Sequence, residues 1–228
     1  MESNTFTQQN TQTQQFEVSK VLRNTYALLA MTMMFSALTA GVSMAVGIGH
    51  GLSLVFSLTA LALVWFVLPR TANSSAGIFV VFGFTGLLGA SLGPLLNHYL
   101  QMANGGSVVV QALGGTALVF FSLSAYVLTT RKDFSFMGGF LFIGLIVALV
   151  AMVGMWIAGA FFDVNVSMFH LGLSVMIVLL MSGFILYDTS RIINGGETNY
   201  ILATTSLYLS IYNLFVSLLH ILGFMNND

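Results

Sequence analysis

Long apolar runs, separated by short polar breaks, fill the chain from residue 25 onward. Each run matches the roughly 20 residues that a helix needs to cross the hydrocarbon core of a bilayer. The pattern predicts seven membrane-spanning helices, at residues 25–46, 52–68, 77–96, 108–128, 136–161, 168–187 and 200–224. The expected fold is therefore an all-α, seven-helix transmembrane bundle.

Residues 1–19 form a polar segment of different composition, dominated by Gln, Thr and Asn. Such a segment buries too little apolar surface to offset the entropy lost on ordering. The sequence thus predicts a disordered tail at residues 1–19 and a transmembrane bundle at residues 20–228.

Composition excludes several classes of protein. Hydrophobic residues make up 57% of the chain and charged residues only 6%, whereas about 25% is usual in soluble domains. Six basic and seven acidic residues leave no basic surface for nucleic acid. The chain has no cysteine, so disulfides and thiolate metal sites are excluded.

The basic residues occupy alternate breaks between the predicted helices. Breaks around His50, His98 and Asp163 contain no Lys or Arg. Because positive residues gather on the cytoplasmic side, we expect a cytoplasmic N-terminus and an outer C-terminus. The residues that support this topology are Lys20, Arg23, Arg70, Arg131, Lys132 and Arg191.

Glycines line one face of the third predicted helix, at positions 83, 86, 89 and 93. A glycine face lets a neighbouring backbone approach closely, so we expect tight helix packing here. Further small residues suggest the same for the rest of the bundle: Gly114, Gly115, Gly138, Gly139 and Gly144.

A polar stripe runs along the last predicted helix at intervals of three and four residues. Polar side chains cannot face lipid cheaply, so this helix is expected to be central or to line a polar cavity. The alternative is that the stripe supplies hydrogen bonds between helices. Its members are Ser206, Ser210, Asn213, Ser217 and His220.

Asp188 is the notable acidic residue, because it follows the sixth apolar run directly. Arg191 lies one turn later, where the two side chains can pair. One interpretation is a helix-end ion pair, and the other is a titratable gate or cation site. Asp133, beside Arg131 and Lys132, is more simply a solvated loop charge.

The sequence gives little support for enzymatic chemistry. It contains no H-E-x-x-H motif, and its four histidines lie in four different segments. No spaced metal motif results. We therefore expect no enzymatic activity, no metal site and no cofactor.

Several segments resemble the Bax inhibitor-1 family. They are GFILYDT at 183–189, GGETNY at 195–200, SLYLSIYNLF at 206–215, GGTALVFF at 114–121, VLTTRKD at 127–133 and KVLRNTY at 20–26. The resemblance covers all but the tail. It implies a seven-helix bundle of the bacterial inner membrane with the last helix at its centre.

The resemblance implies two candidate activities. One bacterial branch is associated with FtsH, a membrane-anchored ATP-dependent protease, as a slowly processed substrate and as a brake on its proteolysis. Other bacterial members are similar in fold and act as pH-sensitive calcium leak pathways. In these, two aspartates, one from each of the last two helices, share a proton and partner an arginine near the end of the second helix. Carried over by position, the first aspartate is Asp188, the arginine is Arg70, and the second aspartate falls on Ser210.

A serine cannot titrate as the second aspartate of that pair would. The sequence therefore favours a regulatory protein that binds FtsH and offers its tail to the protease. A calcium or cation leak is the alternative hypothesis.

Overall fold

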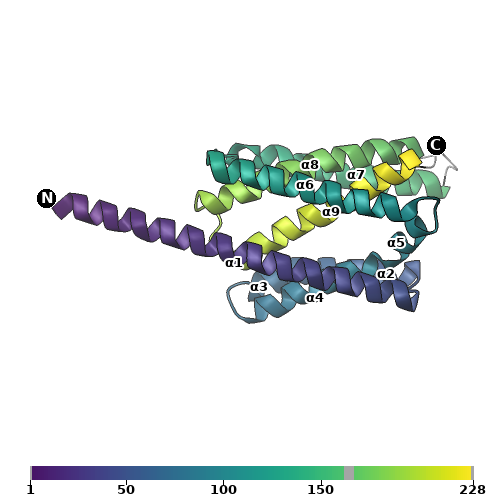
Figure 1. Ribbon diagram of the computed structural model, residues 1–228, viewed down its shortest axis with the longest axis horizontal. Helices are drawn as coiled ribbons and strands as arrows, with labels where there is room; N and C mark the ends of the chain where they lie inside the picture. The colour runs from purple at the N-terminus through teal and green to yellow at the C-terminus, as the bar shows by residue number, and fades with distance from the viewer. Residues whose placement is uncertain (1, 162–166, 227–228) are drawn as a thin grey trace. The chain divides into compact units, whose positions relative to one another are not determined.

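A computed structural model of the chain describes residues 2–161 and 167–226, and for residues 2–15 and 160 it describes only the backbone. Every regular element in this part of the chain is helical (Figure 1). The elements are α1 (Glu2–Val46), α2 (His50–Ala62), η1 (Leu63–Val67), α3 (Leu68–Thr71), α4 (Ala76–Ser91), α5 (Gly93–Leu100), α6 (Gly105–Thr130), η2 (Ser135–Met137), α7 (Gly138–Phe161), α8 (Ser167–Ile193) and α9 (Tyr200–Asn226).

Seven helical segments are long and apolar enough to cross a membrane, which confirms the predicted all-α, seven-span fold. They are Phe16–Val46, His50–Thr71, Ala76–Leu100, Gly105–Thr130, Ser135–Gly159, Ser167–Ile193 and Tyr200–Asn226. Most boundaries lie within a few residues of the predicted ones. The orientation of the spans across the membrane stays a prediction.

The first span begins earlier than its apolar run, because the helix continues without a break through residues 16–19. Composition alone assigns these four residues to the tail. The backbone of residues 2–15 belongs to the same helix, α1, and no side chains are described there. That the tail lacks stable structure of its own stays a prediction.

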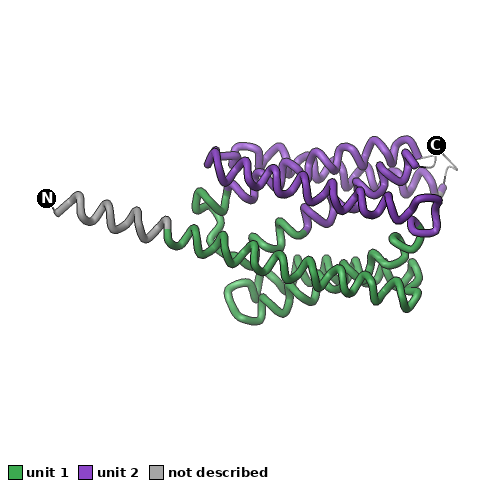
Figure 2. Tube along the Cα trace, in the orientation of Figure 1, with its two compact units in different colours: residues 1–98, 191–208 green, residues 99–190, 209–228 purple. Residues whose placement is uncertain are grey.

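Two compact units make up the chain (Figure 2). Unit 1 comprises residues 1–98 and 191–208, and unit 2 comprises residues 99–190 and 209–228. The boundary between the units after residue 98 lies within α5, and the boundary after residue 208 lies within α9.

In unit 1, α1 packs closely on α4 and on the first residue of α5 through the predicted glycine face. A Cβ carbon at Gly86 would lie 2.6 Å from the Phe35 ring, and one at Gly93 would lie 2.8 Å from Ser43 Cβ. A Cβ carbon at Gly89 would lie 2.7 Å from Ser36 Oγ. Gly83 differs, since its nearest neighbour is Leu63 Cδ1 at 3.7 Å. The prediction of tight packing is thus confirmed for three of the four glycines.

In unit 2, α7 and α8 meet by reciprocal leucine–glycine contacts. The Leu180 side chain of α8 lies over Gly144 of α7, 2.5 Å from where a Cβ carbon would be. The Leu141 side chain of α7 lies over Gly183 of α8 in the same way, at 2.6 Å. Each glycine therefore accommodates the leucine of the facing helix, which lets the two backbones approach closely.

The predicted role of the other small residues holds only in part. Gly138 faces the Tyr187 ring, Gly144 faces Leu180, and Gly115 lies at ordinary contact distance from Leu218. A Cβ carbon at Gly114 or Gly139 would meet no neighbouring helix within 4 Å. Adjacent residues on a helix point about 100° apart, so one glycine of each pair faces outward.

Helix α9 is buried along both of its halves. From Ala203 to Phe224 no residue is exposed, and half of its most apolar window is buried. The corresponding share is 11% for the span His50–Thr71 and 11% for Ser135–Gly159. The span Ala76–Leu100 is the other well-buried one, at 56%. The predicted central position of the last helix stays a prediction.

Candidate functional site

The predicted gate residues differ in exposure. Asp188 of α8 is only 6% exposed. Arg70 is exposed at the end of the second span, where its guanidinium donates to the carbonyl of Phe66 on its own helix. The two residues belong to different units, and their pairing stays a prediction.

Arg191 contacts the loop between α8 and α9. Its Nη2 donates to the Gly196 carbonyl at 3.1 Å and lies 3.4 Å from Glu197 Oε2. Sequence reasoning considered only Asp188 as an ionic partner of Arg191. Glu197 could not be preferred in advance, because its approach depends on the turn at Gly195, whose φ is +74°.

Asn199 organises the start of α9 in unit 1. Its Oδ1 accepts hydrogen bonds from the N–H groups of Ile201 and Leu202, at 2.9 and 3.3 Å, as an N-cap does. Its Nδ2 donates to the Ala72 carbonyl and to Asn73 Oδ1, both at 2.9 Å. One amide thus both caps α9 and holds the loop between α3 and α4.

Ser190 performs a similar role in unit 2. It is fully buried, and its Oγ accepts the Phe134 N–H at 2.8 Å and donates to the Lys132 carbonyl at 3.2 Å. The loop between α6 and η2 is thereby fixed to α8. Asp133 in this loop is solvent-exposed, as the sequence predicted. Hydrogen bonds from the Ser135 side chain and backbone hold its carboxyl pKa below the usual range.

The polar stripe of α9 points into protein. Ser210 is 4% exposed and Ser217 is 3% exposed. Ser206, Asn213 and His220 are half-buried, and Asn213 Nδ2 donates to the Leu209 carbonyl one turn earlier, at 2.8 Å. Burial supports the prediction that this face avoids lipid, and any role in conduction stays a prediction.

Tyr208 is a buried polar centre of unit 1 that sequence reasoning missed. Its Oη donates to the Thr85 carbonyl at 3.2 Å and lies 2.6 Å from Ser36 Oγ. Its ring also meets Phe84 edge to face, with centroids 5.5 Å apart. The available signals were a tyrosine within an apolar run and a serine at helical spacing on α1, but neither identifies the partner.

Two histidines come together in unit 2. The ring of His220 lies edge to face with that of His170, with centroids 5.7 Å apart, and 6.3 Å from the Tyr99 ring. Sequence spacing did not indicate this pair, because the histidines belong to different helices. Among the described residues, no group of three or more His, Asp or Glu side chains gathers to hold a metal ion.

A family model described as "Inhibitor of apoptosis-promoting Bax1" matches residues 18–227. The chain belongs to the Bax inhibitor-1 family. The match covers all seven spans and leaves out most of the polar tail, which agrees with the resemblance seen in the sequence motifs.

Three bacterial proteins are similar to the chain over nearly its full length. A protein of Escherichia coli (strain K12) named "Modulator of FtsH protease YccA" is 52% identical over 209 residues, which cover 92% of each chain. A membrane protein of Vibrio cholerae is 50% identical over 223 residues, covering 98% of this chain and 97% of the relative. The E. coli O6:H1 relative, also 52% identical, is named "Inner membrane protein YccA".

The residue at position 210 determines whether this member of the Bax inhibitor-1 family has a proton-sharing pair of carboxylates at Asp188. A proton-sharing pair of carboxylates needs two acidic groups whose charges repel at short range. Position 210 is a buried serine, which cannot take part in such a pair. Asp188 is the single acidic residue of the predicted gate.

Proposed function

We propose that this chain is a multi-pass inner-membrane protein that binds the FtsH protease and modulates its activity. The observation that carries the proposal is the 52% identity, over 92% of both chains, with the E. coli protein named as a modulator of that protease. The family match at residues 18–227 extends from the first membrane span to the last.

The short loops suggest where the protease is bound. Between consecutive spans, the described loops hold only a few residues, as at 47–49, 72–75, 101–104 and 131–134. A partner therefore meets this protein mainly within the membrane or at the N-terminal segment. The spans His50–Thr71 and Ser135–Gly159 offer the largest outward surface, since only 11% of each window is buried.

The N-terminal segment is suited to be the part that the protease grips. A protease driven by ATP needs an unstructured end to begin threading, and residues 1–19 lack the apolar groups that would hold them against the bundle. Fully extended, such a segment reaches about 60 Å. The close glycine packing of α1 on α4 opposes extraction of the first span, which would make degradation slow.

The test measures half-life and protease binding separately. Removal of residues 1–19 should lengthen the half-life of the protein in cells that contain FtsH, and it should leave unchanged the amount that co-purifies with FtsH from mild detergent. Replacing the segment with a Gly/Ser sequence of equal length controls for length alone. An unchanged half-life contradicts the grip at the tail, and failure to co-purify contradicts the binding itself.

A cation leak is the second candidate, favoured by the burial of Asp188 in a chain that spans the membrane. Its test uses purified protein in liposomes that contain a calcium-sensitive dye. A leak through this site should be reduced by Asp188→Asn and should vary with pH. Flux no greater than that of empty liposomes at acidic and neutral pH contradicts it.

A further inference from the structure

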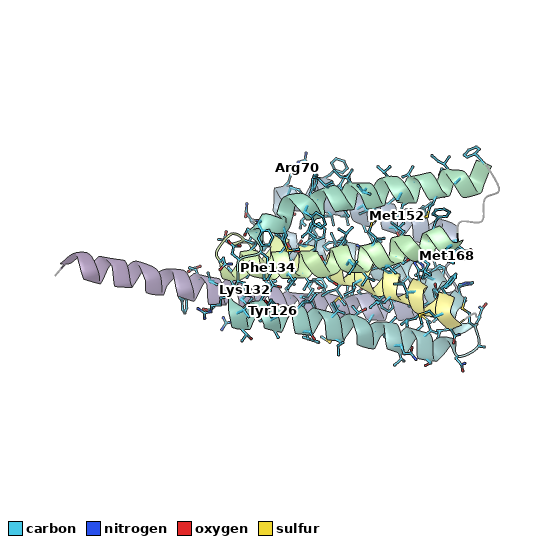
Figure 3. The ribbon with its side chains drawn as sticks, turned by 90° about the horizontal axis from the view of Figure 1, so that it is seen from above. Arg70, Tyr126, Lys132, Phe134, Met152 and Met168 are labelled. Carbon is cyan, nitrogen blue, oxygen red and sulfur yellow. The ribbon has the colours of Figure 1, made fainter. Side chains whose placement is uncertain are left out.

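A cluster of cationic and aromatic side chains lies at the membrane boundary of unit 2. The spans on either side end at Thr130 and begin at Ser135, so residues 131–134 lie at the level of the lipid headgroups. Figure 3 labels three members, Tyr126, Lys132 and Phe134, at the end of α6 and in the loop that follows it.

The side chains of this cluster contact one another. Lys132 Nζ lies 5.8 Å from the centroid of the Tyr126 ring and donates to Tyr126 Oη at 3.3 Å. The Tyr126 and Phe134 ring centroids are 6.2 Å apart, and those of Phe134 and Phe136 are 6.4 Å apart. A continuous aromatic surface thus adjoins one ammonium group.

This surface is open to the surroundings of the protein. The side chain of Phe136 is 80% exposed and that of Tyr126 is 43% exposed, and Arg131 and Lys132 are exposed as well. Aromatic rings at the level of the headgroups lie with their apolar faces against lipid and their polar atoms toward water. The exposed Phe136 ring is therefore placed to contact acyl chains.

The hydrogen-bond directions leave donors for an anion. Tyr126 Oη accepts from Lys132, so its own O–H is directed elsewhere and can donate. An ammonium group has three donors, and one of those on Lys132 is used by Tyr126. The neighbouring Asp133 carboxylate is turned to the loop itself, since its Oδ1 accepts the Ser135 N–H at 2.8 Å.

The cluster is also held in place by the fold. Buried Ser190 binds the backbone on both sides of Asp133, through the Phe134 N–H and the Lys132 carbonyl. The backbone that carries Lys132 is therefore fixed before any ligand arrives, which lowers the entropy lost on binding.

We propose that Lys132 and Tyr126, with the adjoining rings of Phe134 and Phe136, bind the phosphate headgroup of an anionic membrane lipid. The ammonium and phenol groups donate to the phosphate oxygens, and the aromatic surface contacts the first part of the acyl chains. Arg131 adds a second positive charge beside the site.

The experiment counts lipids bound to the purified full-length protein by native mass spectrometry, during titration with phosphatidylglycerol. Phosphatidylcholine with the same acyl chains and excess inorganic phosphate serve as competitors. Lys132→Gln should weaken phosphatidylglycerol binding about fivefold, as expected for one basic residue at an anionic surface. Tyr126→Phe should also weaken it, although this variant keeps the ring and every charge.

Lys20→Gln is the matched control, because Lys20 is also exposed but lies outside the cluster. Equal weakening by Lys20→Gln and Lys132→Gln, with none by Tyr126→Phe, would mean diffuse charge attraction and overturn the site. If phosphatidylcholine displaced phosphatidylglycerol at equal concentration, the site would have no preference for anionic lipid, and the proposal would be overturned. Competition by inorganic phosphate alone would show an anion site without lipid recognition and overturn the lipid assignment. Circular dichroism spectra of all variants must match that of the parent protein.

Discussion

Replacing Gly89 with alanine should separate α1 from α4 in unit 1. The added carbon would lie 2.7 Å from Ser36 Oγ and closer still to the Ser36 carbonyl oxygen and Thr39 Oγ1. Nonbonded heavy atoms prefer about 3.5–4.0 Å. The Ser36 carbonyl belongs to the backbone and cannot rotate away, so the two helices must move apart by about 1 Å.

The expected cost follows from three contributions. Overpacking costs about 1–3 kcal/mol, and movement of Ser36 also strains its 2.6 Å hydrogen bond with Tyr208, which contributes about 0.5–1.5 kcal/mol. The higher helix propensity of alanine offsets up to about 1 kcal/mol. The net destabilisation is therefore about 0.5–4.5 kcal/mol.

Gly83→Ala provides the control within the same helix. Its added carbon meets only Leu63 Cδ1 at 3.7 Å, so the propensity gain of up to about 1 kcal/mol should remain. The propensity gain is common to both variants, so the difference between them is about 1.5–4.5 kcal/mol. Relative to this control, Gly89→Ala should lower the unfolding midpoint by about 3–18 °C, taking about 2–4 °C per kcal/mol. Circular dichroism during heating in one mild detergent measures both variants, and equal midpoints would refute the reasoning.

Three further changes test individual hydrogen bonds. Asn199→Ala removes the α9 cap and two hydrogen bonds to the α3–α4 loop, and should lower the free energy of unfolding, measured by thermal unfolding, by about 1 kcal/mol or more. Asn199→Asp keeps the cap and should lower it by less. Hydrogen bonds hold the pKa of the Asp133 carboxyl in the folded protein below its usual range. They therefore stabilise the folded loop at any pH above about 3.9, the pKa of this carboxyl in the unfolded chain. This stabilisation is lost as the pH falls through the lower pKa of the folded protein. Amide exchange in the loop should therefore accelerate below about pH 4 in the parent protein, and Asp133→Asn should abolish that acceleration. Tyr208→Phe should lower stability by about 1–2 kcal/mol, and adding Ser36→Ala should cost less than the sum of the single changes.

The features predicted correctly from sequence are those that depend on local pattern. Seven apolar runs determine seven spans, because each helix must satisfy its own backbone within the bilayer. The face of the span Ala76–Leu100 that carries Gly86, Gly89 and Gly93 follows from the 3.6-residue helical period alone. The buried stripe at Ser210 and Ser217 follows from the same period and the cost of placing polar groups in lipid.

The features missed from sequence are those that join distant segments. Tyr208 and Ser36 are separated by 172 positions, and nothing in either local pattern specifies the other. The same holds for Ser190 and the loop at 132–134, and for His170 and His220. A local pattern shows which face of a helix is polar, but it does not show which helix meets that face.

The sequence by itself determined that this protein spans a membrane seven times, belongs to the Bax inhibitor-1 family, and has serine at 210 where a second gate carboxylate is expected. Hydropathy, helical period and residue identity are local properties, so no tertiary contact is needed to read them. Only the tertiary structure decided that Arg191 meets Glu197, that Asn199 and Ser190 hold the loops, and that Lys132 lies over Tyr126. Those contacts depend on how helices are rotated and how turns direct side chains, which is set by packing across the whole of each unit.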